Sequence, residues 1–200
     1  MKRLSTNTKR TPAYLTSIFT LLAIFGMTAM TQHAKAQSAY KVAEGSQVVV
    51  AGSSNLHDWT MTATSFSCEA SVAIKGDQVS DITALSTTIP VTNLKSKDKS
   101  MDSRAYKTLN SDTYKNITFK LTDATVAGKV IKATGNLTIS GVTVPVTITS
   151  TYTVAGGVIT IKGAEKIKFS QFKIKAPSFM FGALKVTDDL TIDILLKLKG

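Results

Sequence analysis

The sequence predicts an all-β fold, and three observations support this. Apolar residues recur at every second position in several long segments, which is the pattern of strands with one buried face. Short glycine-containing segments separate them at 75–77, 127–129, 140–141 and 155–157, as expected for antiparallel hairpins. Helical spacing occurs only over 100–109, where Met101, Ala105 and Leu109 are four residues apart. We therefore expect an antiparallel sheet of eight or more strands and one short helix.

The first 36 residues have the order of a secretory signal peptide. Lys2, Arg3, Lys9 and Arg10 precede an apolar run over 14–30, and Ala34-Lys35-Ala36 follows it. Threonines and a serine interrupt the run, and it is short for a membrane anchor. We expect cleavage after Ala36 and export of residues 37–200 to the periplasm or the medium.

Residues 37–200 contain predicted strands with the same alternation of apolar and polar residues throughout. In the clearest, Val142, Val144, Val146 and Ile148 alternate with three threonine or proline positions. The predicted strands are 47–52, 57–65, 66–74, 79–91, 117–122, 131–139, 142–154, 158–162, 166–174 and 190–198. No internal repeat or linker indicates a second domain. Such strands can close into a barrel or stack as a sandwich, and a barrel of eight strands has room for one small ligand.

The charge of the chain is modest once the signal is removed. Residues 1–36 hold five basic and no acidic side chains, so cleavage lowers the net charge from +11 to +6. The remaining lysines are dispersed, and no basic run is interleaved with aromatic residues. This disfavours nucleic acid as a partner and is compatible with transient contact with an anionic membrane surface.

Cysteine and histidine are too scarce for a disulfide or a multi-histidine metal site. Cys68 is the one cysteine of the chain, and it shares a strand face with Phe66 and Ala70, so we expect a buried apolar role. His57 is the one histidine of residues 37–200. A single Cys and a single His do not make a zinc site. We expect no metal.

The segment GSSNLHDWTMTA, from Gly52 to Ala63, contains the strongest candidate for catalysis. Adjacent residues of a strand point to opposite faces, so Asp58 should not orient the ring of His57, and no nucleophile accompanies them. We therefore expect no catalytic residue and no enzyme activity: His57 lies at a rim, and Trp59 packs inward. We expect the paired carboxylates Asp98 and Asp102 to face solvent.

Four motifs in order resemble the YceI-like family of lipocalin-like, polyisoprenoid-binding periplasmic proteins. They are Gly52-Ser53-Ser54-Asn55-Leu56-His57-Asp58-Trp59-Thr60, Asn93-Leu94-Lys95-Ser96, Tyr114-Lys115-Asn116-Ile117-Thr118-Phe119 and Phe179-Met180-Phe181-Gly182. Lys115 stands where the family usually has proline. The resemblance covers essentially all of residues 37–200.

The resemblance implies an eight-stranded antiparallel, lipocalin-like barrel with one short helix. It also implies an apolar tunnel for a long-chain isoprenoid, such as a quinone or a polyprenyl lipid, with no further cofactor. We expect Phe179 and Phe181 to face the ligand or the core and Met180 to cap an opening. The predicted ligand contacts are His57, Trp59, Phe66, Phe119, Leu121, Val144, Val146, Ile148, Tyr152, Phe169, Phe172, Phe179, Met180, Phe181, Ile192 and Ile194.

Other functions stay open at this point. A small outer-membrane barrel has a suitable size, but the expected terminal aromatic residue is missing, since the chain ends in Leu198-Lys199-Gly200. A lipid-acting enzyme lacks a nucleophile motif. A solid sandwich used only for protein contacts would have no cavity. Homodimer formation is a further alternative that the sequence leaves open.

Overall fold

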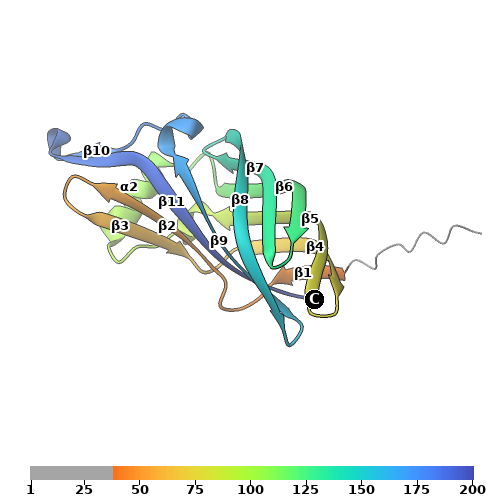
Figure 1. Cartoon of the computed structure of the whole chain (residues 1–200). Coiled ribbons are helices and arrows are strands. Elements are labelled where there is room, and N and C mark those ends of the chain that lie inside the picture. Colours follow the sequence, from red (N-terminus) through yellow and green to blue (C-terminus); the bar gives the residue numbers. More distant parts are fainter. Residues whose placement is uncertain (1–37) are drawn as a thin grey trace, which may run out of the picture. The chain divides into compact units, whose positions relative to one another are not determined.

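The computed structural model describes residues 38–200, so the predicted signal peptide lies outside the described residues. Figure 1 shows strands along most of this part of the chain. The strands are β1 (Ser38–Val42), β2 (Gln47–Ser54), β3 (Asp58–Ala63), β4 (Ser67–Lys75), β5 (Gln78–Pro90), β6 (Asn116–Ala127), β7 (Val130–Ile139), β8 (Val142–Ala155), β9 (Val158–Lys168), β10 (Ser178–Phe179) and β11 (Leu184–Lys199). The helices are α2 (Lys99–Thr108) and the 3₁₀ helices η1 (Val91–Asn93), η2 (Phe169–Phe172) and η3 (Met180–Gly182).

Eight of the strands form a closed antiparallel ring. Their order is β1-β4-β5-β6-β7-β8-β9-β11, and β11 returns to β1 through the pairs Lys41–Lys199 and Val42–Leu198. Closure leaves no free edge at this end of the ring, which matters for a protein rich in β-branched residues. The predicted eight-stranded antiparallel barrel with one short helix is confirmed.

The hairpin turns follow the glycine-containing segments. Between β7 and β8, Ile139 pairs with Val142, and the two turn residues Ser140 and Gly141 have φ of +49° and +77°. A two-residue hairpin of this type needs positive φ at both positions, which glycine adopts without strain. The predicted turn at 140–141 is therefore confirmed.

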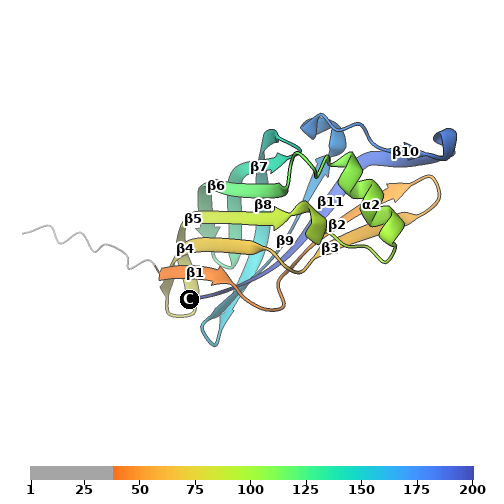
Figure 2. The same ribbon diagram turned by 180° about the vertical axis from the view of Figure 1, so that it is seen from behind.

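At the other end of the molecule the ring opens between β3 and β5. Strand β2 pairs with β11 and with β3, but β3 reaches the next segment only through a single bridge between Thr62 and Lys95. Figure 2 shows α2 beside β2 and β3 at this opening. The apolar face of α2, formed by Met101, Ala105 and Leu109, packs into the core cluster around Met61. No helix of residues 38–200 is long and apolar enough to cross a membrane.

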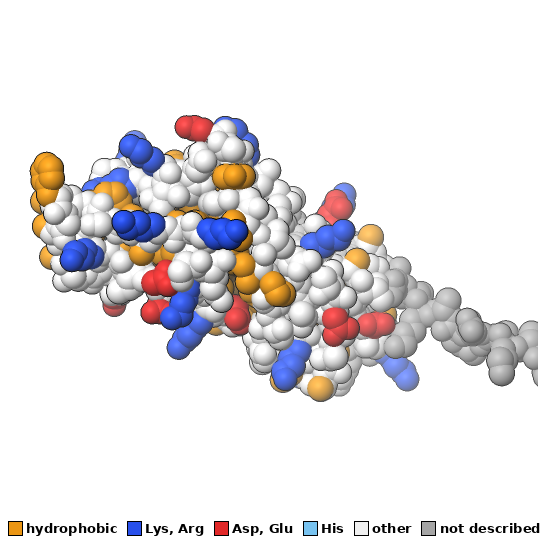
Figure 3. Space-filling model, turned by 90° about the horizontal axis from the view of Figure 1, so that it is seen from above, with side chains coloured by type: hydrophobic (Ala, Val, Ile, Leu, Met, Phe, Trp, Pro, Cys, Tyr) orange, Lys and Arg blue, Asp and Glu red, His pale blue; other side chains and the backbone are white. Residues whose placement is uncertain are grey.

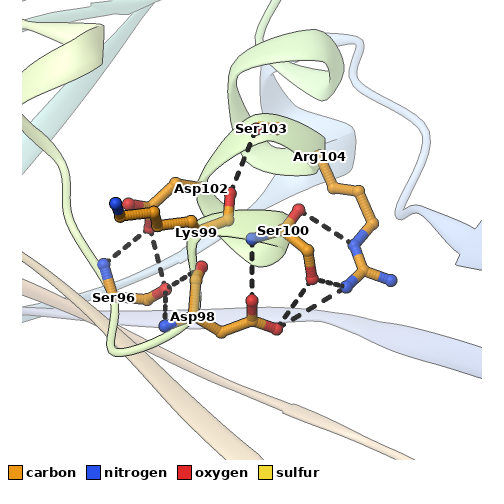
Figure 4. Close-up of polar contacts among 7 residues, drawn as sticks. All are labelled: Ser96, Asp98, Lys99, Ser100, Asp102, Ser103 and Arg104. Atoms are coloured by element: carbon orange, nitrogen blue, oxygen red, sulfur yellow. Dashed lines mark hydrogen bonds and ion pairs between the residues drawn. The ribbon is translucent and has the colours of Figure 1, made fainter.

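Two carboxylates hold α2 in this position (Figure 4). Asp98 caps the helix, because its Oδ1 accepts a hydrogen bond of 2.7 Å from the Ser100 amide. Asp102 is buried at 7% exposure and accepts hydrogen bonds from the amide (2.7 Å) and hydroxyl (2.8 Å) of Ser96. The expectation that Asp102 faces solvent is therefore wrong: its carboxylate satisfies the backbone of the preceding loop.

The structure differs from the predicted segments at several places. Strand β1 was not expected, and β11 begins at Leu184 rather than at 190. The predicted strand 166–174 divides into the end of β9 and the 3₁₀ helix η2. In η2 the buried Phe169 and Phe172 are three residues apart, which matches the three residues per turn of a 3₁₀ helix. Lys173, with φ of +56°, ends the turn.

Candidate ligand-binding cavity

The inside of the ring is hollow. Inward-pointing apolar residues such as Val50, Leu121, Ile148 and Ile192 are only half-buried, although they face the interior. They line a cavity of about 310 Å³, within the range of small-molecule binding sites. The walls come from β2, β3, β5 to β9, β11 and α2. The interior therefore has space for a ligand that a packed core would not leave.

The cavity has a deep apolar end and a polar mouth. The deep end includes the buried residues Ile82, Ile131, Ile161 and Leu196. At the mouth, the exposed side chains of His57 and Asp98 also line the cavity, together with Ser54 and Arg104. A molecule with a polar head and an apolar tail matches this distribution.

The structure brings twelve of the sixteen residues predicted from the sequence to the cavity wall. They are His57, Trp59, Phe66, Phe119, Leu121, Val146, Ile148, Phe169, Phe172, Phe179, Ile192 and Ile194. Most of them were predicted because residues at every second position of a strand point to the same face of the sheet. Their contact with a ligand stays a prediction.

Met180 and Phe181 lie outside the cavity wall. Met180 is 70% exposed and Phe181 fully exposed, so the expectation that Phe181 faces inward beside Phe179 is wrong. Both residues have φ of +53°, in the left-handed region, which breaks the alternation that the strand pattern assumed. Of this motif, only Phe179 lines the cavity.

Val144 and Tyr152 also lie off the wall, although they share the inward face of β8. Val144 packs into the apolar cluster around Phe172. Tyr152 is 2% exposed, and its hydroxyl accepts a hydrogen bond from the Val79 amide (3.1 Å) and donates to the Gly128 carbonyl (3.0 Å). Tyr152 therefore fills the interior near the turns, and its expected place on the tunnel wall is corrected.

Trp59 has a specific place on the wall. Its indole lies over Gly52 of β2, where any side chain would overlap the ring. The indole Nε1 is buried and has no hydrogen-bond partner among residues 38–200. An unpaired buried donor is costly, so a ligand oxygen that reached Nε1 would remove this cost.

His57 and Asp58 do not form a catalytic pair in this geometry. Both side chains are exposed, and the His57 Nδ1 lies 2.9 Å from the backbone carbonyl oxygen of Asp58, not from its carboxylate. The turn is fixed by Ser54, whose hydroxyl donates to the His57 carbonyl at 2.9 Å. His57 therefore lies at the rim of the cavity, as expected.

Glu165 is a lining residue that the sequence analysis missed. It follows Ile161 and Gly163 at the inward positions of β9, and the half-buried side chain lines the cavity. Burial among apolar residues raises the pKa of its carboxyl group. The signal was available in the sequence, because Glu165 shares the parity of Ile159, Ile161 and Ile167.

Arg104 of α2 is another charged lining residue that was missed. Its guanidinium lies 5.2 Å from the centre of the Phe179 ring and forms an ion pair of 3.7 Å with Asp98. The ring contact connects the helix to β10, and the ion pair joins Arg104 to the N-cap residue of the same helix. They place an ion pair, with no net charge, at the mouth of the cavity.

The structure confirms the expected buried role of Cys68. Cys68 is 2% exposed, and burial raises the pKa of its thiol. Among residues 38–200, no group of three His, Cys, Asp or Glu side chains is arranged to hold a metal ion.

Comparisons with known proteins agree with this architecture. The family described as the YceI-like domain matches residues 33–198. Among solved structures, BcnA of Burkholderia cenocepacia has a TM-score of 0.65 at 23% identity, over 76% of this chain and 95% of that chain. A polyisoprenoid-binding domain from Saccharophagus degradans has a TM-score of 0.59 at 12% identity, over 82% and 99% of the two chains. The YceI protein of Campylobacter jejuni has a TM-score of 0.52 at 20% identity, over 65% and 79%. No curated protein matches the sequence.

Proposed function

Because the chain belongs to the YceI-like domain family, we propose that it is a binding protein that holds a long-chain isoprenoid inside its ring of strands. The ligand is a prenylated quinone or a polyprenyl lipid. The observation that carries this proposal is the apolar cavity, which extends from the mouth at His57 to Ile131 and Ile161 near the closed end of the ring. One similar structure is a polyisoprenoid-binding domain, which supports the same class of ligand.

The free energy of such binding comes from the tail. Each Å² of apolar surface that leaves water contributes roughly 25 cal/mol, so a tail of several hundred Å² gains on the order of 10 kcal/mol before ordering costs. No covalent step and no cofactor is needed for this gain. The protein acts here as a container rather than as a catalyst.

The polar groups of the cavity favour one kind of head group on the ligand. Trp59 lines the cavity, its buried indole N–H has no partner among residues 38–200, and the Arg104 guanidinium lies at the rim, paired with Asp98. A head with carbonyl or hydroxyl oxygens that reached the indole N–H would satisfy this donor, whereas a plain hydrocarbon would not. This favours an amphiphile with an oxygen-bearing head over an alkane-like ligand.

We also propose that the binding takes place outside the cytoplasm. The order of basic, apolar and small residues over 1–36 supports a cleaved signal peptide. Exported carriers keep insoluble chains away from water between membranes. Mass spectrometry of the N-terminus after expression in a bacterium tests this part: the proposal predicts a chain that begins at Gln37.

Trp59 provides the test of ligand binding, because it is the one tryptophan of the chain and lines the cavity. Ubiquinones quench tryptophan fluorescence at contact, so a titration of the purified protein reports occupancy. We expect saturation at one quinone per chain and an affinity that rises with tail length until the cavity is full. A tail-less quinone that binds as tightly as the prenylated ones would contradict the proposal. A polyprenyl alcohol and a fatty acid, added as competitors, distinguish the ligand classes.

A further inference from the structure

Three large apolar side chains are exposed together at one end of the molecule. Leu56 is 65% exposed, Met180 70%, and Phe181 fully exposed. Leu56 belongs to the β2–β3 turn, and the other two belong to η3, more than 120 residues later in the sequence. Figure 3 shows apolar side chains at the left end, the end at which β10 lies in Figure 1. We call Leu56, Met180 and Phe181 the apolar tip.

Hydrogen bonds of Asn55 fasten the two loops to each other. Its side-chain Nδ2 donates to the Ala183 carbonyl at 2.8 Å, and its Oδ1 accepts from the Lys185 amide at 2.8 Å. The Asn55 amide also donates to the Lys185 carbonyl at 3.0 Å. The backbone of Met180 and Phe181 has positive φ, which is rare for large side chains. The fold therefore holds these side chains in water in a fixed and unfavourable arrangement.

The segment that carries Met180 and Phe181 is basic, although Asp58 is exposed two residues after Leu56 and Asp188 follows the segment. The segment from Lys173 to Thr187 contains three lysines and no acidic residue, and Lys173, Lys175 and Lys185 are all exposed. Arg104 lies against Phe179, immediately before the tip. Apolar side chains flanked by lysines match the interface of an anionic bilayer, where rings enter the head-group region and cations meet phosphates.

The same two loops border the cavity mouth. Ser54 and His57 flank Leu56, and Phe179 and Leu184 flank the other tip residues; all four line the cavity. We propose that the apolar tip inserts into the surface of an anionic lipid bilayer, so that the mouth faces the membrane from which a long-chain ligand is taken. This proposal rests on the proposed function for its purpose, but its contacts with lipid are independent of the cavity.

Vesicle co-sedimentation tests the tip directly. Vesicles of phosphatidylcholine with phosphatidylglycerol, and of phosphatidylcholine alone, are mixed with the purified protein. We expect binding to the anionic vesicles that weakens as salt is added. The double variant Met180→Ser/Phe181→Ser should lose at least about tenfold in affinity, because it removes the largest inserted surface. The variant Val130→Ser, at an apolar side chain that is 40% exposed at the start of β7, should bind like the original protein.

Two further measurements make each result decisive. Circular dichroism establishes that the double variant is folded, and Leu56→Ser gives a second, independent loss if it is not. The quinone titration through Trp59 should be unchanged in the double variant, since neither residue lines the cavity. A protein that binds quinone but not anionic vesicles, or a double variant that binds vesicles normally, would overturn the tip and leave the proposed function intact. Vesicle binding without quinone binding would support the apolar tip and contradict the proposed function.

Discussion

At the scale of single residues, Trp59 combines two roles in one side chain. Its ring covers Gly52 and forms part of the cavity wall, while its Nε1 is buried without a partner. The first role stabilises the free protein, and the second reduces its stability until an acceptor arrives. Substitutions that separate the ring from the N–H therefore distinguish the two.

We expect Trp59→Phe and Trp59→Ala to behave differently. Phenylalanine keeps an aromatic wall and removes the unpaired donor, so stability should stay within about 1 kcal/mol while affinity for an oxygen-bearing ligand falls about fivefold. Alanine leaves a void, so it should cost about 2–4 kcal/mol and also lose ligand. Urea unfolding and the amount of lipid that co-purifies measure both effects. The control Asp58→Asn alters an exposed neighbour and should change little; full lipid content in Trp59→Ala would show that Trp59 does not contribute to ligand binding.

Glu165 predicts a dependence of stability on pH. Burial raises the pKa of its carboxyl group, so the ionised form is disfavoured in the folded state. The ionised carboxylate therefore destabilises the fold near neutral pH, and this penalty disappears as the pH falls through the raised pKa. Glu165→Gln should stabilise the protein at about pH 7, by less than about 1 kcal/mol because the group is only half-buried. This gain in stability should vanish at about pH 4.

Thermal unfolding at the two pH values measures this difference. Glu69→Gln is the matched control, because the same substitution is made on an exposed side chain of β4. A gain in Glu165→Gln that is equal at both pH values would mean that ionisation of Glu165 is not its cause.

Individual wall residues could be predicted where strand parity holds. Val146 and Ile148 follow from one alternating segment, and both line the cavity. Parity fails at Phe181, where a left-handed backbone turns the side chain outward. Strand parity does not predict the burial of Asp102, which depends on hydrogen bonds from Ser96. Such contacts depend on where a loop lies, which a periodic pattern does not encode.

At the scale of elements, α2 is the one α-helix in the cavity wall among residues 38–200. Its apolar face closes the opening between β3 and β5, and Asp102 ties its first turn to the preceding loop. The helix has only ten residues, a length that is marginal in isolation, so tertiary contacts hold it in place.

Removing the Asp102 carboxylate should loosen this helix. Asp102→Ala leaves the Ser96 amide without its acceptor, at a cost of about 1–3 kcal/mol, and should speed ligand release through the mouth beside α2. Asp102→Asn retains an acceptor oxygen and should cost less. Urea unfolding and stopped-flow release of quinone give the two values. Asp112→Ala, at an exposed carboxylate after the helix, is the control, and an Asp102→Ala protein as stable as that control would contradict the role of Asp102.

The predicted elements differ most from the structure where the hydrophobic period changes. Residues 166–174 continue the apolar pattern of β9, but the spacing of Phe169 and Phe172 changes from two to three. Strand β1 has only five residues, too few for a clear alternating pattern, and it pairs with β4 and β11. Local patterns predict strands with one apolar face. They do not predict a strand that forms through backbone pairing with strands distant in the sequence.

At the scale of the whole molecule, closure of the ring decides between the architectures that the sequence left open. The pairs Lys41–Lys199 and Val42–Leu198 join the first and last strands across nearly the full sequence. Such distant pairing leaves no mark in composition or periodicity, so the sequence alone allows a sandwich as well as a barrel. Once the ring is closed, the inward residues surround one cavity, and α2 and β2–β3 form its mouth.

The central claim is that a long apolar chain occupies the inside of this ring. A matched pair of substitutions tests it: Ala133 is half-buried and lines the cavity, whereas Ala164 is exposed on the outer face of β9. Native mass spectrometry of the purified proteins, followed by organic extraction, counts lipid molecules per chain. We expect about one isoprenoid per chain in the original protein and in Ala164→Phe, and clearly less in a folded Ala133→Phe, whose ring takes up part of the cavity. Equal lipid in both variants, or none in the original protein, would contradict the claim.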